Sequence, residues 1–254
     1  MSKFTIYELP LNERIRTFLR LEFLFQQTLY SLRGYSVWDS RSTVTSLLEI
    51  SNILARIDLR TELLKELERQ KKAIQGLSSV QGIDLQILQQ TLASLNEKNQ
   101  LLMTGTPNAD PLKGNELLKM IRQRESIPGG TCDFDLPAYH HWLTLPPEER
   151  IKSLEIWLNH YDIYHGTLQI LLKNLRESAS IVSVTAKDGF YQQGLDSSSP
   201  AQLIRVLLEP ECFYYAELSG GKHRFSVRFM TTENYERPVP YAENISFKLA
   251  CCVL

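Results

Sequence analysis

The 254-residue sequence has no apolar run near the length of about 20 residues that a membrane-spanning helix needs. It also lacks a recognisable secretory leader, because Phe4–Leu11 is short and interrupted by polar side chains. We therefore expect a soluble, cytoplasmic protein that makes no membrane contact.

Cysteine is scarce, and neither sign of charge is in excess. The four cysteines form no C-x-x-C pair; they are Cys132, Cys212, Cys251 and Cys252. The adjacent Cys251 and Cys252 would point to opposite faces of a strand. This predicts buried or idle thiols in a reducing cytosol.

Lys plus Arg number 28 and Asp plus Glu 29, so the net charge is −1. That balance argues against a general nucleic-acid-binding protein.

Catalytic motifs are also missing, including the phosphate loop, the dinucleotide fingerprint, the nucleophile elbow and the H-E-x-x-H zinc motif. Ser219–Lys222 resembles a phosphate loop, but it lies between two predicted strands with no helix to follow, which favours a hairpin turn. His160 and His165 are five apart and do not share a helix face, and His140 and His141 diverge. The sequence therefore predicts no enzyme, no metal and no cofactor.

Helical periodicity occupies the chain to about residue 180. Apolar residues recur at helical spacing from Ile15 to about Leu32, behind the candidate N-cap Asn12. Asp39 is a candidate cap for a second helical stretch, which we expect to continue with a bend to about Ile74. Further helices are expected from residue 84, around 117–121 and 140–143, and in two stretches over 147–178.

A β pattern of alternation and β-branched residues begins at Ile181. Phe4–Tyr7 alternates too. The predicted fold class is α+β, with a mostly helical domain over 10–178 and an antiparallel β domain over 179–254, to which residues 1–9 can add a strand. The expected strands are Ile181–Ala186, Phe190–Gln193, Gln202–Leu208, Phe213–Leu218, Lys222–Met230 and Ile245–Cys251.

Ser126–Arg150 reads as an ordered loop with a short helix, because Gly129–Gly130 permits positive φ and prolines break regular structure. Asp133 and Asp135 flank Phe134 and could be paired carboxylates. The favoured interpretation is that they hydrogen-bond the Gly129–Gly130 loop or cap a turn. Four aromatic residues are expected in the core rather than in a peptide pocket: Phe18, Phe23, Trp142 and Trp157.

Four segments carry a resemblance to a known family: PLNERIRTFLRLEFL (10–24), RTELLKELERQ (60–70), IRQRESIPGGTCDFDLPAYHHWL (121–143) and GGKHRFSVRFM (220–230). FKLACC (247–252) also fits. Together they resemble the ZapD family of FtsZ-associated cell division proteins, in one order over essentially the whole chain. The chain departs from the family at Glu116, where related proteins carry a basic residue, so no site role is transferred to that position.

The resemblance implies a symmetric homodimer of two-domain subunits. It also implies binding to the carboxy-terminal tail of FtsZ and cross-linking of FtsZ filaments in the Z ring at mid-cell, without catalysis or a cofactor. Two equivalent sites in a dimer would supply the bivalency that cross-linking requires. It makes five residues candidates for FtsZ contacts: Arg20, Arg56, His140, Arg224 and Arg228.

The chemistry of these residues suits such a partner, because a planar guanidinium binds a carboxylate at two points. Each candidate also has a structural interpretation. Arg20 could pair with nearby glutamates on a solvated helix, Arg60 is expected to be structural, and Arg224 and Arg228 could keep an edge strand soluble.

Two other functions stay open on the sequence alone. One is an enzyme or a small-ligand-binding protein with a pocket at the domain junction, which the missing nucleophile and base disfavour. The other is a nucleic-acid adaptor, which fits the rows of arginine but not the net charge.

Overall fold

The computed structural model describes residues 4–79, 82, 84–105, 112, 114–232 and 237–254. These residues form eight α-helices, one short 3-10 helix and eight β-strands, which confirms the predicted α+β class. The chain divides into two compact units. One contains Met1–Phe18 and Leu172–Leu254 and is called the β unit here; the other contains Leu19–Leu171 and is called the helical unit.

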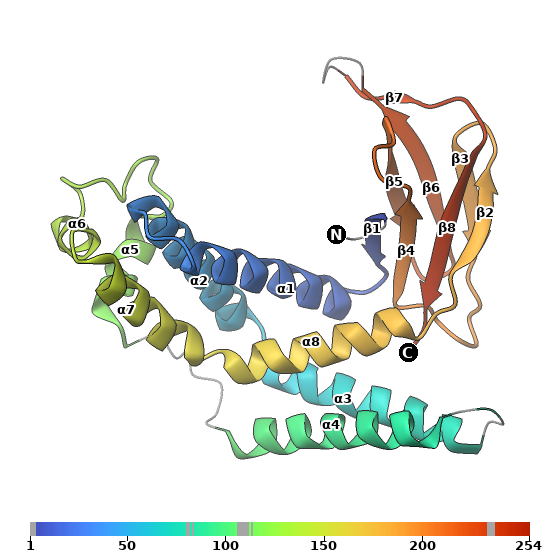
Figure 1. Cartoon of the computed structure of the whole chain (residues 1–254), viewed down its shortest axis with the longest axis horizontal. Helices are drawn as coiled ribbons and strands as arrows, with labels where there is room; N and C mark the ends of the chain where they lie inside the picture. The colour runs from blue at the N-terminus through green and yellow to red at the C-terminus, as the bar shows by residue number, and fades with distance from the viewer. Residues whose placement is uncertain (1–3, 80–81, 83, 106–111, 113, 233–236) are drawn as a thin grey trace. The chain divides into compact units, whose positions relative to one another are not determined.

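The helices follow one another along the first 177 residues (Figure 1). The division between the two units falls inside the first helix and inside the last. The elements are α1 (Glu13–Leu32), α2 (Val37–Arg56), α3 (Leu59–Gly76), η1 (Leu77–Ser79), α4 (Leu85–Thr104), α5 (Glu116–Arg124), α6 (Pro137–Leu143), α7 (Pro147–Asn159) and α8 (Asp162–Glu177).

The helix starts are set by local capping. Asn12 caps α1 as predicted, since its Oδ1 accepts a hydrogen bond from the Ile15 N–H at 2.9 Å. The predicted cap of α2, Asp39, is instead the third residue of that helix. Ser36 is the cap, and Ser36 and Asp39 accept each other's backbone N–H in a capping box.

The single bent helix predicted from Asp39 to Ile74 is two helices. Ile57 is extended, with φ −132° and ψ 147°, which ends α2 at Arg56. Asp58 then accepts a hydrogen bond from the Thr61 N–H and starts α3. The prediction missed this break because continuous apolar spacing hid a good N-cap residue in its middle.

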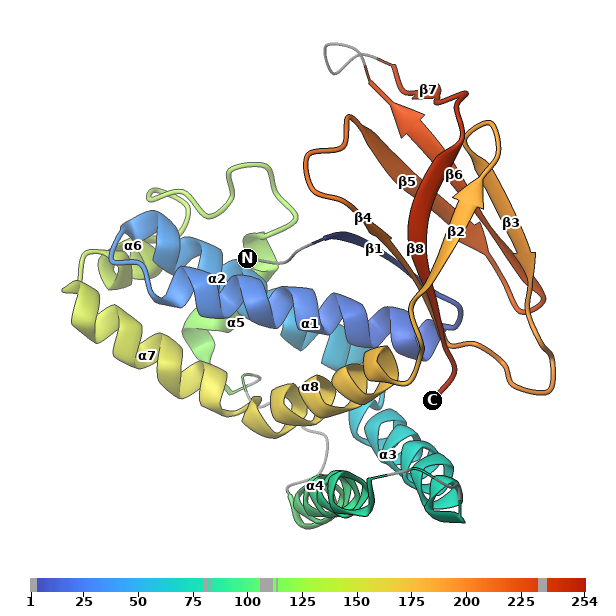
Figure 2. The same ribbon diagram turned by 45° about the vertical axis from the view of Figure 1, so that its right-hand side comes forward.

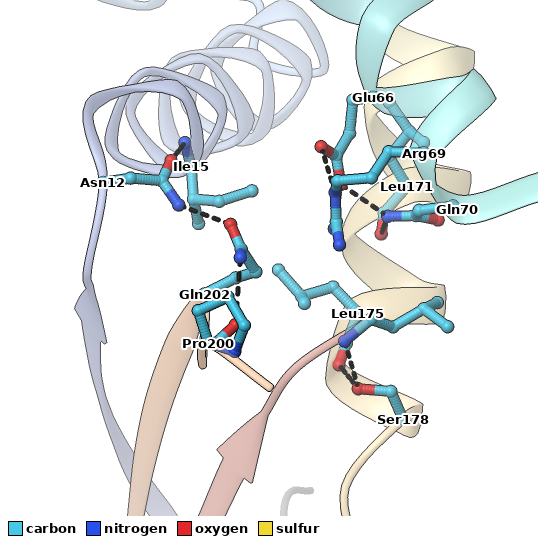
Figure 3. A network of polar contacts seen from close by, with 11 residues as sticks. Asn12, Ile15, Glu66, Arg69, Gln70, Leu171, Leu175, Ser178, Pro200 and Gln202 are labelled. Atoms are coloured by element: carbon cyan, nitrogen blue, oxygen red, sulfur yellow. Dashed lines mark hydrogen bonds and ion pairs between the residues drawn. The ribbon is translucent and has the colours of Figure 1, made fainter. Parts of the chain in front are cut away.

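Within the helical unit, α2 contacts α5 and α7, α5 contacts α6, and α3 contacts α4 (Figure 1). Glu66 of α3 is buried, and its carboxylate accepts hydrogen bonds from Arg69 Nε at 2.9 Å and Gln70 Nε2 at 3.1 Å. Gln70 also donates to the Leu171 carbonyl at 3.0 Å (Figure 3). The buried acid is therefore satisfied by its own helix, and the same network joins α3 to α8.

The β unit holds two antiparallel sheets (Figure 2). One has the strand order β1-β4-β8-β2, and the other has β3-β6-β5 with β7 pairing to β6. Buried side chains of both sheets form one core. The strands are β1 (Thr5–Pro10), β2 (Val182–Ala186), β3 (Phe190–Gly194), β4 (Leu203–Leu208), β5 (Tyr214–Gly220), β6 (Arg224–Thr231), β7 (Val239–Pro240) and β8 (Ile245–Cys252).

The amino-terminal strand is confirmed, since β1 pairs antiparallel with β4 and places Glu8 opposite Arg205. Residues 1–3 of the predicted 1–9 strand lie outside the described residues. The Glu8 carboxylate accepts from Arg205 Nε at 2.9 Å and from Arg176 of α8 at 2.8 and 2.9 Å. Asn12 donates to Gln202 Oε1 at 2.6 Å (Figure 3). These contacts fix both ends of β1 within the β unit.

The turn between β2 and β3 requires a glycine. Asp188 and Gly189 both have positive φ, at 48° and 68°, as the central pair of a tight hairpin does. A Cβ on Gly189 would lie 1.7 Å from the Tyr241 carbonyl oxygen. Any other residue at position 189 would therefore meet both a steric clash and an unfavourable backbone conformation.

The core predictions hold for Phe18 and Trp142, which are buried. Trp157 is only half-buried, and Phe23 is 64% exposed, so the core prediction for Phe23 is wrong. The buried stripe of α1 runs through positions 18, 21 and 25, and position 23 points away from it.

Candidate functional site

The five predicted contact residues lie on both units. Arg20 is exposed on α1, Arg56 is exposed in the last turn of α2, and His140 is exposed on α6, all in the helical unit. Arg224 and Arg228 are exposed on β6 in the β unit. The structure thus places three candidates on the helical unit and two on the β unit.

The β6 strand has the predicted alternation. Arg224 and Arg228 are exposed, whereas Phe225, Val227 and Phe229 are buried in the core. Because β6 lies between β3 and β5, it is an interior strand of its sheet. The interpretation that these arginines protect an edge strand is therefore wrong, since the strand's hydrogen bonds are already taken on both sides.

The charge environment separates the candidates from their neighbours. Arg16 pairs with Glu13 at 3.0 Å, and Arg60 donates to the Met103 carbonyl at 2.8 Å, as expected for structural arginines. In the described parts of the chain, by contrast, Arg20, Arg56 and the two β6 arginines form no ion pair, although Glu217 of β5 lies opposite Arg228 in the sheet. Four exposed guanidinium groups are therefore available to an anionic partner.

His140 lies in a groove of the helical unit with a volume of about 640 Å³. The groove is bounded by the start of α2, by the loop that follows α5, and by α6. We call it the α2–α6 groove. Its lining residues are Val37, Trp38, Arg41, Gly129, Thr131, Cys132, Asp133, Phe134, His140, Leu143 and Thr144.

Arg41 is the fixed cation of the α2–α6 groove. Its Nη1 donates to the Thr131 carbonyl at 3.0 Å, and its guanidinium carbon lies 5.0 Å from the ring centre of Tyr139 and 5.6 Å from that of Trp38. Tyr139 is buried, and burial raises its pKa to about 12 against the opposing effect of the Arg41 charge. A neutral ring therefore lies beside the guanidinium, as a cation–π contact requires.

Asp133 is shared by two groove residues. Its Oδ1 lies 3.3 Å from Arg41 Nη2 and 3.1 Å from His140 Nδ1. Asp135 instead contacts Cys132 Sγ at 3.5 Å and Arg124 Nη1 at 4.0 Å. The described contacts of these carboxylates are with Arg41, His140, Arg124 and the neighbouring Cys132, and not with the backbone of Gly129–Gly130, which was one of the two roles predicted for them. The Cys132–Asp135 contact spans three positions and is local to the loop, as the other predicted role, capping a turn, would be.

The buried Arg150 of α7 holds the turn that begins α2, next to the groove residues Val37 and Trp38. Its guanidinium donates to the Tyr35 carbonyl at 2.9 Å, the Ser36 carbonyl at 3.2 Å, Ser40 Oγ at 2.6 Å and the Leu145 carbonyl at 3.2 Å. One side chain therefore fixes the turn that begins α2, and this turn carries the groove residues Val37 and Trp38.

Two aromatic side chains that line the groove are largely exposed to solvent: the exposed fraction is 76% for Trp38 and 84% for Phe134. The sequence prediction missed Arg41 and both aromatics as site residues. Two sequence features could have indicated the aromatic residues of the groove. Phe134 lies in a loop rich in Gly and Asp, and Trp38 lies in the first turn of a helix with an N-cap.

A second hollow, of about 410 Å³, lies over the β5–β6 connection. Its lining includes Gln192 of β3 and residues 219–226, and Arg224 is among them. The predicted hairpin at Ser219–Lys222 is confirmed, since β5 ends at Gly220 and β6 begins at Arg224 in antiparallel pairing.

The described residues contain no group of three or more His, Cys, Asp or Glu side chains placed to hold a metal ion. The four cysteines are free thiols, and burial raises the pKa of Cys252 to about 11. Among the described helices, none is long and apolar enough to span a bilayer.

The fold and the groove together define an α+β protein that presents exposed guanidinium groups and exposed aromatic rings on its surface. Comparison with known families then identifies the chain. The model of the ZapD family, described as a cell division protein, matches residues 19–228. The chain belongs to the ZapD family, and this membership supports a role in cell division.

Similar proteins cover the whole chain. A cell division protein ZapD of Methylococcus capsulatus is 42% identical over 255 residues, which are 100% of both chains. Proteins of the same name from Cronobacter sakazakii and Escherichia coli are 38% and 35% identical over 252 residues, 99% of this chain and 100% of theirs.

Proposed function

We propose that this protein is a non-catalytic division factor that binds FtsZ and, as a homodimer, cross-links FtsZ filaments. It acts in the cytoplasm at the mid-cell division ring, where bundling promotes assembly and stability of the Z ring. In this proposal the helical domain, residues 10–178, binds the FtsZ tail, and the β domain, residues 179–254, contacts the filament.

The observation that carries the proposal is the set of exposed guanidinium groups that form no ion pair among the described residues: Arg20, Arg56, Arg224 and Arg228. On β6, Glu217 of β5 lies opposite Arg228, whereas Arg224 lies opposite Gly194 and is the more open of the two to an anionic partner. Family membership supports a division protein as the setting for that partner.

Arg20 is the first residue to test. An FtsZ tail carries carboxylates, and a lost charge-assisted contact at an exposed site typically weakens binding by about tenfold or less. Arg20→Glu also adds repulsion, so we expect at least about a tenfold loss of tail-peptide affinity with helical content unchanged. Lys152→Glu, exposed on α7, makes the same charge change in the same unit and should bind like the wild type.

The β6 pair is expected to act on filaments rather than on an isolated tail. The double variant Arg224→Glu, Arg228→Glu should reduce filament bundling in a pelleting assay more than it reduces tail-peptide affinity. Lys187→Glu, exposed in the β2–β3 turn, is the matched control.

The homodimer is tested by light scattering, which should give about twice the 29.3 kDa chain mass. A monomer at micromolar concentration would contradict the bridging mechanism. Co-sedimentation with FtsZ and with tail-deleted FtsZ tests the function itself. Equal recovery of the protein in both pellets would overturn tail binding, and no recovery in either would overturn the function.

A further inference from the structure

We propose that the outer edge of β2 is a contact between copies of this chain, in which β2 of one copy pairs antiparallel with β2 of a second. The inference rests on the self-association in the proposed function and names a surface for it. The occupant of the edge is the same segment of the second copy, residues 181–186.

β2 is the last strand of its sheet, and one side of its backbone is open. The strand order β1-β4-β8-β2 leaves it paired with β8 alone (Figure 2). In an edge strand, alternate residues point their N–H and C=O groups away from the sheet. Among the described residues, no backbone hydrogen bond outside the β2–β8 pairing involves Val182–Ala186. The edge therefore offers donors and acceptors to an incoming strand.

This edge lacks the features that keep edge strands apart. Such strands in soluble proteins are usually protected by a charge, a proline or a bulge. The segment IVSVTA at 181–186 contains no charged residue, proline or glycine, and four of its six residues are β-branched. Its register with β8 is continuous, without a bulge. Both composition and geometry thus favour the addition of another strand.

Apolar side chains add to the backbone contribution. Ile181 is 53% exposed and Val182 is 50% exposed. Val184 packs against the core of the β unit, and Val182 lies on the same face of the strand two positions earlier. Val182 is therefore a core-facing side chain left open at the side of the sheet. A strand added at this edge covers it and removes apolar surface from water.

The other edge strands of the β unit are less suited to such pairing. β1 contains Glu8 and Pro10, and it contacts β5, the edge strand of the second sheet. β3 has no charge, but it ends at Gly194, and glycine weakens a strand. β2 is thus the edge at which the observations point to a partner strand.

A second copy supplies a strand that fits. Two-fold symmetry places an edge strand against itself in the antiparallel sense, which is the sense of every described strand pair in the β unit. Because residues 181–186 are uncharged, the two copies bring no like charges together within the pair. The alternation of valine with serine and threonine also matches itself, apolar side chains on one face and hydroxyls on the other.

The contact is expected to be weak. Stable protein interfaces bury about 1,200–2,000 Å² in total, and a single short strand pair provides less than that. Association through β2 should therefore depend on protein concentration. It also occupies the edge in both copies, so that each chain gains one neighbour through this contact.

Hydrogen exchange tests the backbone contact. Amides of residues 182–186 that point away from β8 should exchange more slowly in a concentrated sample than in a dilute one. Amides of β3, residues 190–194, belong to an edge of the other sheet and should exchange at the same rate in both samples. Concentration-independent exchange at 182–186, in a sample that self-associates, would overturn the proposal.

Charge variants of the exposed Thr185 test the pairing of like with like. In a two-fold pair centred on the strand, Thr185 of the two copies lie within about 8–10 Å, where their charges still interact. Thr185→Lys and Thr185→Glu should each weaken self-association about fivefold in sedimentation velocity, because like charges then meet. An equimolar mixture of the two variants should restore it, because opposite charges then meet.

Gln192→Lys is the matched control, since Gln192 is exposed on β3 and the variant adds the same charge to the same unit. It should associate like the wild type. Circular dichroism and thermal unfolding verify that each variant is folded. A loss of association with Gln192→Lys but not with Thr185→Lys would assign the contact to β3 and overturn the proposal.

The outcomes separate this inference from the proposed function. If the wild type self-associates and both Thr185 variants match it, the β2 edge is not the contact and the proposed function stands. If both variants are weakened and their mixture is not restored, β2 does not pair with itself, and the inference is wrong. If the mixture is restored but the wild type does not sediment with FtsZ, the inference stands and the proposed function fails. A wild type that stays monomeric at high micromolar concentration overturns the inference and filament bridging together, whereas tail-peptide affinity still reports FtsZ binding by a single copy.

Discussion

The two candidate surfaces present cations in opposite ways. On β6, Arg224 and Arg228 project from an interior strand whose backbone is fixed on both sides. Neither forms an ion pair among the described residues, although the exposed Glu217 of β5 lies opposite Arg228 in the register of the sheet. In the α2–α6 groove, Arg41 and His140 already contact the carboxylate of Asp133. The β6 arginines form no ion pair among the described residues, whereas the cations of the groove are already paired.

This difference teaches how one protein can combine weak and selective contacts. An open row of cations raises encounter rates and depends on ionic strength, but discriminates poorly. In the groove, the contact with Asp133 already satisfies Arg41 and His140, so an anion that brings charge alone would gain little by displacing it.

The largest effect is expected from breaking the support of the groove. Arg150→Met removes the donor that serves the carbonyls of Tyr35, Ser36 and Leu145 and the hydroxyl of Ser40. Buried acceptors left without donors destabilise, so the free energy of unfolding should fall by about 3 kcal/mol in urea denaturation.

Lys152→Met on the same helix is the control, since Lys152 is exposed and its loss should change stability by no more than about 0.5 kcal/mol. An Arg150→Met protein with wild-type stability would show that the turn before α2 holds itself in place through the Ser36–Asp39 capping box alone.

The next effect concerns the β unit. Burial favours the neutral form of Glu8, but hydrogen bonds and charges from Arg176 and Arg205 outweigh it and lower the pKa of this carboxyl. A pKa lowered by folding stabilises the protein above the unfolded-state pKa and loses that stabilisation as pH falls. Glu8→Gln should therefore reduce the free energy of unfolding by about 2 kcal/mol at pH 7.

The difference in free energy of unfolding between wild type and Glu8→Gln should narrow as pH falls below about 4, where the wild-type carboxyl takes up its proton. Urea denaturation of both proteins over a pH series measures this difference. A gap that stays constant with pH would mean that packing of β1, rather than the charge of Glu8, makes the contribution. Intrinsic tryptophan fluorescence, to which Trp38, Trp142 and Trp157 all contribute, should be the same in both proteins at pH 7.

The smallest effect is a difference in salt dependence between the two surfaces. Exposed charges are screened within about 8–10 Å at physiological ionic strength. Both filament pelleting and tail-peptide affinity should fall as salt rises, and pelleting should fall more steeply because it includes the β6 arginines. An unchanged tail affinity would mean that apolar packing alone carries the tail contact.

The sequence predicted the elements best where a periodic pattern and a capping residue coincide. Asn12 and α1, the strand at Arg224–Thr231 and the Ser219–Lys222 hairpin are examples. It failed at Ile57–Asp58, where apolar spacing continues through a helix break. Strand β7 has only two residues, too few for an alternation pattern, and no prediction covered it.

The groove was harder to predict, because its parts come from distant segments. Arg41 reaches Asp133 across 92 positions, and no local spacing signals that contact. Asp133 and His140 were noticed individually, but an exposed aspartate in a turn-rich loop has many local hydrogen-bonding options. The three side chains come from α2, from the loop after α5 and from α6, and the contacts of α5 with α2 and with α6 bring these segments together.

The pairing of β1 with β4 has a consequence for how the chain is made. Glu8 and Arg205 are 197 positions apart, so the first strand leaves the ribosome long before its partner exists. At about 5–20 residues per second, that strand waits roughly 10–40 s with its hydrogen-bonding edge unpaired. The helical unit can fold during this interval, whereas the first sheet cannot close until β4 and β8 have emerged. A nascent chain stalled after α8 therefore carries an exposed Thr5–Pro10 segment that other extended chains can pair with.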